Sequence, residues 1–228
     1  MMGAREFNPS DLLGPLNEVE VKNAPKRLYV AGDVDLLRAG SRVSIVGSRG
    51  ASEDGLKRAR SLARALVERD VVVVSGLAEG IDTAAHEAAI AAGGRTIAVL
   101  GTPLDSNYPA SNRMLRQRIM RDHLAVSQFA SGQPSQRQNF PMRNRTMALI
   151  SDATVIVEAG EKSGTLHQGW EAIRLGRLLF LMESVVKDSR LSWPEEMIRY
   201  GAQILSRQNL DEVIGNLPSL SVADDIAL

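Results

Sequence analysis

The chain has no cysteine, few aromatic residues and no long hydrophobic run. The lack of cysteine excludes a disulfide framework, a thiol nucleophile and a cysteine-ligated metal. A membrane-spanning helix needs roughly 20 apolar residues, and the first residues lack the apolar segment of a secretion signal. We therefore expect no membrane segment and a cytoplasmic location. Lys plus Arg equals Asp plus Glu at 27 each, so a nucleic acid could bind only at a local basic patch.

What the chain does contain favours an α/β fold. Hydrophobic residues make up 44% of the sequence and aromatic residues only 4%, so the core consists mainly of Val, Ile, Leu, Ala and Met. That composition is typical of a parallel sheet between two layers of helices. From residue 42 onward, short apolar runs alternate with helical stretches, as in repeated β-α-β units. We predict three layers, with a mostly parallel sheet flanked by helices.

The predicted elements follow this alternation along the chain. Strands are predicted at Val43–Val46, Val71–Ser75, Thr96–Leu100, Leu124–Ser127, Thr154–Glu158, Leu178–Met182 and Ala202–Leu205. Helices are predicted at Ser52–Arg69, Ile81–Ala92, Ser111–Arg121, Pro141–Ser151, Leu166–Gly176 and Pro194–Arg199.

The two ends of the chain are expected to lie outside this alternation. Residues 1–40 carry three prolines and no sustained periodicity, apart from a short extended segment at Arg27–Ala31. We interpret residues 1–40 as a loosely structured N-terminal arm and lead-in, residues 41–217 as the main domain and residues 218–228 as a C-terminal tail. A polar loop at Ala130–Asn139 interrupts the main domain, and long loops in compact domains are often functional.

Glycine-rich turns follow three of the predicted strands, at Gly47–Gly50, Ser75–Asp82 and Ser163–Thr165. Such turns let backbone N–H groups approach a phosphate, and the helix that begins after each turn adds a favourable dipole. Each turn alone is equally compatible with a tight turn or a helix cap. The spacing matches neither the dinucleotide fingerprint nor the Walker motif, so we expect no nucleotide cofactor of those types.

Arg143 and Arg145 follow Pro141, a residue suited to the start of a helix. Cations are unfavourable near a helix N-terminus, so this pair favours a bound anion, although two solvated arginines are an alternative. The three glycine-rich turns and the arginine pair together predict one shared phosphate-binding crevice.

Asp82 and His86 stand four residues apart and would share one face of a helix. They could form a dyad or two metal ligands, but a capping aspartate and a structural histidine explain them as well. Because no further ligands cluster in the sequence, we expect no metal site and no catalytic residue.

Four stretches together resemble the DNA processing protein A family, also called DprA or Smf, over roughly Pro25 to Leu217. They are Gly47-Ser48-Arg49, Ser75–Asn112, FPMRNR from Phe140 and VIVEAGEKSGTL from Val155. The resemblance implies an extended Rossmann-like domain that dimerises, binds single-stranded DNA in a basic pocket and is not an enzyme. It also implies that the protein protects incoming DNA and promotes loading of a RecA-type recombinase during natural transformation. The expected binding residues are Gly47, Ser48, Arg49, Ser75, Gly76, Gly80, Arg143, Asn144, Arg145, Ser163, Gly164 and Thr165.

Several features depart from that family. We see no long N-terminal helical module and no C-terminal winged-helix-like extension, and the stretches Ser127-Gln128 and Met182–Ser184 differ from many members.

Two related hypotheses about the function stay open. One is a LOG-type phosphoribohydrolase, whose Gly-Thr motif resembles Gly164-Thr165 but whose catalytic Glu is Gln168 here. The other is a sensor that binds a nucleotide without hydrolysing it. For the DNA-binding reading, Arg49→Ala and Arg143→Ala are expected to weaken binding without unfolding the protein.

Overall fold

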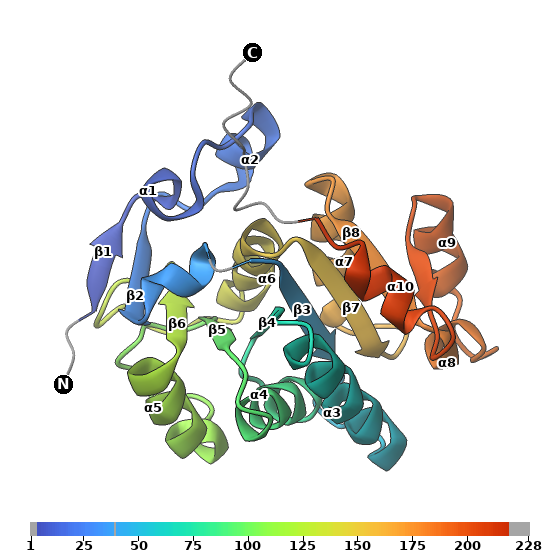
Figure 1. Ribbon diagram of the computed structural model, residues 1–228. Coiled ribbons are helices and arrows are strands. Elements are labelled where there is room, and N and C mark those ends of the chain that lie inside the picture. The colour runs from blue at the N-terminus through green and yellow to red at the C-terminus, as the bar shows by residue number, and fades with distance from the viewer. Residues whose placement is uncertain (1–3, 39, 219–228) are drawn as a thin grey trace.

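The computed structural model describes residues 4–38 and 40–218 (Figure 1). Within these residues nine strands form one sheet in the order β1-β2-β6-β5-β4-β3-β7-β8-β9. β2 pairs antiparallel with both β1 and β6, whereas the remaining neighbours from β6 to β9 are parallel. The strands are β1 (Arg5–Phe7), β2 (Leu28–Gly32), β3 (Arg42–Gly47), β4 (Val72–Ser75), β5 (Thr96–Leu100), β6 (Leu124–Ser127), β7 (Ala153–Glu158), β8 (Leu178–Met182) and β9 (Gln203–Leu205).

Helices cover both faces of the sheet, which confirms the three-layer, mostly parallel α/β fold. α3, α4, α5 and α10 pack on one face, and α6, α7 and α9 pack on the other. The helices are α1 (Pro9–Leu13), α2 (Glu18–Asn23), α3 (Glu53–Val67), α4 (Ile81–Ala91), α5 (Arg113–Asp122), α6 (Asn139–Ile150), α7 (Thr165–Arg174), α8 (Glu183–Val186), α9 (Trp193–Arg199) and α10 (Leu210–Gly215), with short 3-10 helices η1 (Val34–Leu37) and η2 (Ala110–Asn112).

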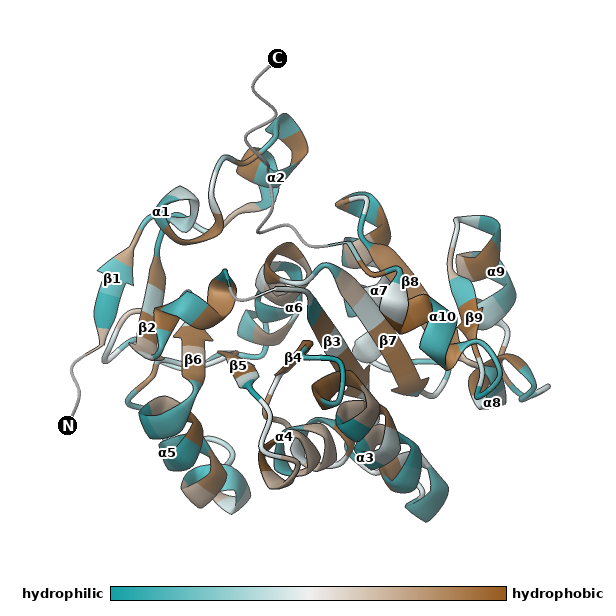
Figure 2. Cartoon of the chain, viewed as in Figure 1, coloured by the Kyte–Doolittle hydropathy of each residue, from teal (hydrophilic) through white to brown (hydrophobic). Residues whose placement is uncertain are grey.

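The strand sequences explain why both faces are covered. In β4, Val72 and Val74 belong to the core beneath α6 and α7, whereas Val73 belongs to the core beneath α3 and α4. A strand buried on both faces needs a continuous apolar run, and β4 has one. Figure 2 shows the central strands as hydrophobic and much of α3 and α5 as hydrophilic. The helices therefore present one apolar side to the sheet and a polar side to solvent.

The order of the strands reverses next to β3. The chain runs from β3 through β4 and β5 to β6 on one side, and then returns to place β7 on the other side of β3. Open α/β sheets bind ligands at such a reversal, beyond the carboxyl ends of the strands. The turns after β3, β4 and β7 all reach this edge, as the sequence predicts.

The seven predicted strands and six predicted helices are all present, with ends shifted by a few residues. No end shifts by more than two residues, and α6 begins at Asn139 rather than at Pro141. α8 and α10 were not predicted. They have four and six residues, too few for a periodic pattern to be visible in the sequence.

The interpretation of residues 1–40 as loosely structured is wrong for the part that the structure describes. This segment contains β1, α1, α2, β2 and η1, and β2 extends the sheet by pairing with β6. Leu28 and Val30 of β2 are fully buried, as is Leu37 after it. The prolines lie at a helix start and in turns, where they do not disturb regular structure. The boundary at residue 40 stays a prediction, and residues 219–228 of the expected tail lie outside the described residues.

Within residues 4–38 and 40–218, none of the helices combines the length and apolar character needed to cross a membrane.

Candidate nucleic-acid interface

A cavity of about 230 Å³ lies at the carboxyl edge of β3 and β7, where the order of the strands reverses. We call this cavity the crevice. It is lined by residues from the turns after β3 and β7 and from α4 and α6. Eight of the twelve residues expected to bind phosphate line it: Gly47, Ser48, Arg49, Arg143, Asn144, Ser163, Gly164 and Thr165. The turns after β3 and β7 and the start of α6 therefore meet at one cavity, and phosphate binding there stays a prediction.

A second cavity of about 360 Å³ adjoins the crevice, and we call it the aromatic cavity. The two cavities share Arg49, Ala78, Phe140 and Arg143 as lining residues. The aromatic cavity extends from there over the turns after β4 and β5, to the loop that carries Tyr108. A ligand bound in the crevice could thus continue past the two arginines into the aromatic cavity.

The turn after β3 is held in place by Gly80, the residue before α4. Gly80 has a φ of +79°, a conformation that favours glycine, and a Cβ there would lie 2.4 Å from the carbonyl oxygens of both Ser48 and Arg49. The backbone N–H of Ile81 donates to the carbonyl of Ser48 at 3.3 Å. Gly80 therefore shapes the crevice by allowing two turns to pack together, and it is not itself among the lining residues.

The N-terminus of α3 differs from what the sequence predicts. The glycine-rich turn before α3 is expected to bring a phosphate to this helix, but the carboxylate of Glu158 occupies the position. The backbone N–H of Ser52 donates to Glu158 Oε1 at 2.8 Å and the Ser52 hydroxyl donates to Oε2 at 2.5 Å. Arg58 lies 3.5 Å from the same carboxylate. The anion at this helix terminus is thus part of the protein.

The N-terminus of α7 faces the crevice instead. The Thr165 hydroxyl donates to the carbonyl of Gly47 at 3.1 Å, and the Asn144 amide donates to the carbonyl of Gly164 at 3.1 Å. These bonds join the turn after β7 to β3 on one side and to α6 on the other. Because Ser163, Gly164 and Thr165 line the crevice at the start of a ten-residue helix, this terminus can favour an anion there.

Arg143 is buried in the wall between the two cavities, with only 6% of its surface exposed. Its Nη1 donates to the carbonyl of Val99 at 3.1 Å and lies 4.0 Å from Asp82 Oδ2. A Cβ on Gly76 would lie 1.3 Å from the same nitrogen, so the side chain fits only against glycine. Burial lowers the pKa of Arg143 and raises the pKa of Asp82, but an arginine stays charged in proteins. Arg143 therefore provides a fixed positive charge.

Two other expected residues have structural partners outside the cavities. Arg145 lies 3.4 Å from Glu171 on α7, and Arg174 lies 3.0 Å from the same carboxylate. The Ser75 hydroxyl donates to the carbonyl of Ile45 at 2.7 Å and is fully buried. Neither Arg145 nor Ser75 lines the crevice or the aromatic cavity.

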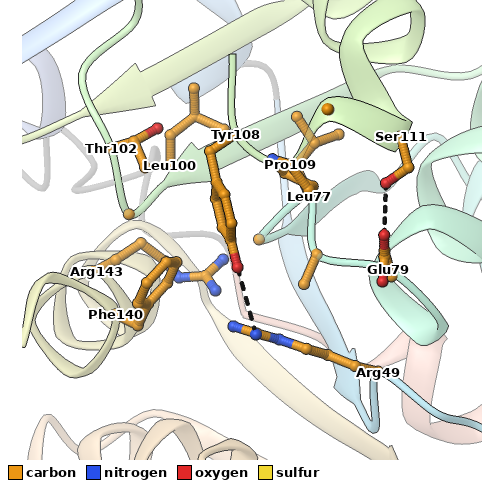
Figure 3. Close-up of a pocket in the computed structure, with 14 residues that line it drawn as sticks. Arg49, Leu77, Glu79, Leu100, Thr102, Tyr108, Pro109, Ser111, Phe140 and Arg143 are labelled. Atoms are coloured by element: carbon orange, nitrogen blue, oxygen red, sulfur yellow. Dashed lines mark hydrogen bonds between the residues drawn. The ribbon is translucent and has the colours of Figure 1, made fainter. Parts of the chain in front are cut away.

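Two aromatic residues at this site were not predicted, because no motif in the sequence marks them among its few aromatics. The rings of Tyr108 and Phe140 are 5.6 Å apart, and the Arg49 guanidinium lies 5.4 Å from the centre of the Phe140 ring. Arg49 also donates to the Tyr108 hydroxyl at 3.5 Å (Figure 3). Tyr108 comes from a loop and Phe140 from the first turn of α6, and each lies next to a proline in the sequence.

Asp82 and His86 each have a different partner in the structure. His86 is fully buried with Nδ1 2.7 Å from the Thr96 hydroxyl, and burial lowers its pKa to about 3. Asp82 faces Arg143 and accepts from the backbone N–H of Ala78 at 3.3 Å. Among the described residues no group of three or more metal-binding side chains comes together. Gln168 lies buried in the crevice wall, where an amide cannot act as an acid or base.

A doubly wound α/β sheet with a crevice at its reversal point places the chain among proteins of the Rossmann-like fold. A family model described as DNA recombination-mediator protein A matches residues 9–218. The chain belongs to this family, which confirms the resemblance that its motifs indicate.

Individual relatives agree with the family assignment. The chain is 38% identical over 200 residues to DNA processing protein DprA of Streptococcus pneumoniae, covering 88% of this chain and 70% of that protein. The X-ray structure of DNA processing protein A from Streptococcus pneumoniae superposes with a TM-score of 0.81 at 35% identity, covering 94% of this chain and 75% of that one. A structure that addresses the single-stranded DNA binding mode of DNA processing protein A from Helicobacter pylori superposes with a TM-score of 0.79 at 26% identity. The superposition covers 95% of this chain and 96% of that one.

Proposed function

We propose that this protein binds single-stranded DNA in the crevice and the aromatic cavity and acts as a recombination mediator that is not an enzyme. In this role it protects incoming DNA and promotes loading of a RecA-type recombinase during DNA uptake. Membership of the recombination-mediator family and the single-stranded DNA binding of the Helicobacter pylori relative support the proposal. A homodimer and a cytoplasmic location belong to the same proposal.

The observation that carries the proposal is the position of Arg49. This exposed side chain lines both cavities and touches both aromatic rings. Its guanidinium can contact a phosphate of a strand whose backbone follows the crevice, toward the start of α7. Arg143 adds a second positive charge behind it. Phosphates would then occupy the crevice, and bases would turn toward Tyr108 and Phe140.

Single-stranded DNA fits this arrangement better than duplex DNA does. Aromatic rings bind bases by stacking only when the bases are not already stacked in a duplex. The cavities, of about 230 and 360 Å³, have the size of small-ligand sites and admit single nucleotides rather than a double helix. Since the formal net charge of the chain is zero, attraction to a duplex backbone over the whole surface is weak.

The experiment is fluorescence anisotropy of a labelled oligo-dT across a salt series, with a duplex of the same length and the Arg49→Ala variant. We expect preference for the single strand, a log-log salt slope near −0.7 for each neutralised phosphate, and clear loss of affinity in the variant. Arg49 is the better test residue, because Arg143→Ala would leave Asp82 buried without its cation. The structure therefore changes the prediction for Arg143→Ala from an intact fold to a destabilised one. Circular dichroism of the variant controls for folding.

The nucleotide-sensor reading predicts a different result. A sensor would bind a free mononucleotide in the crevice but would not bind oligo-dT even at low salt. That outcome would overturn the proposal. Release of free base over many turnovers from a nucleoside monophosphate would instead support the hydrolase hypothesis. Gln168 is evidence against that hypothesis, because an amide cannot act as an acid or base.

A further inference from the structure

The aromatic cavity contains polar groups that phosphate binding does not use. Phosphate contacts require the arginines and the start of α7, but Glu79 also lines this cavity and is acidic. Its Oε1 accepts a hydrogen bond from the Ser111 hydroxyl at 2.6 Å, which holds the carboxylate in one orientation. A carboxylate repels phosphate, so its place in this cavity needs another explanation.

Glu79 and Arg143 lie on opposite sides of the aromatic cavity (Figure 3). The Arg143 side chain lies beside Phe140, and Glu79 lies beside Ser111. In this view Leu77 lies between the two pairs. One side therefore offers hydrogen-bond donors and the other offers acceptors. Tyr108 and Phe140, whose rings are tilted by 57° to one another, provide apolar ring faces on which a base could stack. An aromatic-lined cavity with donors on one side and acceptors on the other is complementary to a planar heterocycle with the opposite arrangement.

Guanine is the nucleobase that has this arrangement. It presents the acceptors O6 and N7 on one edge, which arginine recognises, and the donors N1–H and N2–H₂ on another edge, which a carboxylate can accept. Adenine and cytosine present an exocyclic amino donor where an arginine needs an acceptor. Thymine offers O4 and N3–H in a similar arrangement, but it lacks N7 and a 2-amino group and so can make one hydrogen bond fewer on each side. The volume of about 360 Å³ is at the lower end of the range for small-ligand sites, which is suitable for one base.

We propose that the aromatic cavity is a guanine-selective site that takes one unstacked base, with Arg143 facing its O6/N7 edge and Glu79 facing its N1–H/N2–H₂ edge. This inference rests on the proposed function, because the base is taken from a strand bound in the adjoining crevice. The same chemistry would also recognise the base of free guanosine monophosphate, and the experiment separates the two sources.

The test measures the affinity of oligo-dT in which one central thymidine is replaced by guanosine, inosine, 7-deazaguanosine or adenosine. We expect guanosine to raise the affinity about 10-fold over thymidine and adenosine, in the range of a good bidentate contact. Inosine lacks the 2-amino group that Glu79 would bind, and 7-deazaguanosine lacks the N7 that Arg143 would bind. Each is expected to lose most of the gain.

Glu79→Gln removes the charge while keeping an oxygen for Ser111. In this variant guanosine and inosine are expected to bind equally, while the affinity for plain oligo-dT stays unchanged or rises. Glu87→Gln is the matched control. Glu87 is also an exposed glutamate and lies eight residues after Glu79, in α4, but it does not line the cavity. It is expected to keep the full preference for guanosine.

The outcomes separate this inference from the function on which it rests. Equal affinity for all the oligonucleotides, with normal salt dependence, would overturn the guanine site and leave single-stranded DNA binding intact. Absence of oligonucleotide binding, together with binding of guanosine monophosphate that Glu79→Gln weakens, would support the site and overturn the proposed function. Absence of binding to either ligand would overturn both.

Discussion

The carboxylate of Glu158, at the end of β7, caps α3 by accepting hydrogen bonds from both the backbone N–H and the hydroxyl of Ser52. The Ser52 oxygen in turn accepts from the backbone N–H of Gly55 at 3.0 Å. One carboxylate thus connects the two strands at the reversal of the sheet, β3 and β7, through the helix that follows β3. The anion that a glycine-rich turn commonly binds as a ligand is here supplied by the chain itself.

Glu158→Ala is expected to destabilise the protein by about 1–2 kcal/mol, the usual effect of losing a helix cap. Urea unfolding followed by circular dichroism would measure this loss. Glu68→Ala is the matched control, because Glu68 is an exposed carboxylate at the opposite end of α3, where a negative charge is unfavourable. A loss of stability in Glu68→Ala as large as in Glu158→Ala would contradict the capping role.

Gly76→Ala is expected to displace Arg143. The added Cβ would overlap the guanidinium, whose Nη1 lies 1.3 Å from its position, so the arginine must leave its contacts with Val99 and Asp82. We expect a loss of about 1–3 kcal/mol in stability, typical of overpacking, and weaker binding of oligo-dT. Gly160→Ala is the control, since a Cβ there meets no atom within 4 Å. Wild-type stability in both variants would show that Arg143 is not fixed by this contact.

Local sequence patterns predict the sheet and its helices because those patterns depend on neighbouring residues. The apolar run of β4 and the glycine-rich turns are such features, and the turns after β3 and β7 supply six of the eight expected residues that line the crevice. Most of the N-terminal segment escaped prediction for the same reason. β1 has three residues and α1 has five, so neither shows a period. The extended segment predicted at Arg27–Ala31 corresponds to β2, but local sequence does not show its pairing with β6, about 95 residues later in the chain.

The details of the site could not be predicted because they depend on contacts between distant parts of the chain. Ser52 and Glu158 are 106 residues apart, so the sequence does not show that the start of α3 is already occupied. The contact between Tyr108 and Phe140 likewise joins a loop to the start of α6, 32 residues later in the chain. Arg143 and Arg145 are only two residues apart, yet Arg143 faces the cavities and Arg145 pairs with Glu171. Residues two apart lie on different faces of a helix.

Tyr108→Ala is expected to weaken binding of single-stranded DNA, because a stacked base contributes about 1–3 kcal/mol, or roughly 5-fold to 150-fold in affinity. Tyr108→Phe keeps the ring and should keep most of the affinity. Anisotropy titrations of oligo-dT would measure both variants. Tyr200→Ala tests whether the effect is specific, because Tyr200 is an exposed tyrosine that packs on Trp170 and lines neither cavity. Equal affinity of the wild type and Tyr108→Ala would remove stacking from the proposal.

His86 is expected to make the stability depend on pH. Burial lowers its pKa from 6.5 to about 3 in the folded protein, so between these values the unfolded chain binds more protons than the folded chain. The stability that His86 contributes is therefore complete above pH 6.5 and is lost as the pH falls toward 3. The loss between pH 6.5 and 4.5 is about 2–3 kcal/mol for a group that stays neutral in the folded state.

Urea unfolding of the wild type and of His86→Gln at pH 7 and pH 4.5 would isolate this contribution. The variant is expected to be less stable at pH 7, because it disturbs the contact with Thr96, but to lose about 2–3 kcal/mol less on acidification. The raised pKa of Asp82 acts in the opposite direction, since its ionised form is disfavoured by burial. Asp82 is present in both proteins, so its effect largely cancels in the comparison. The same pH dependence in both proteins would mean that His86 becomes protonated in the folded state.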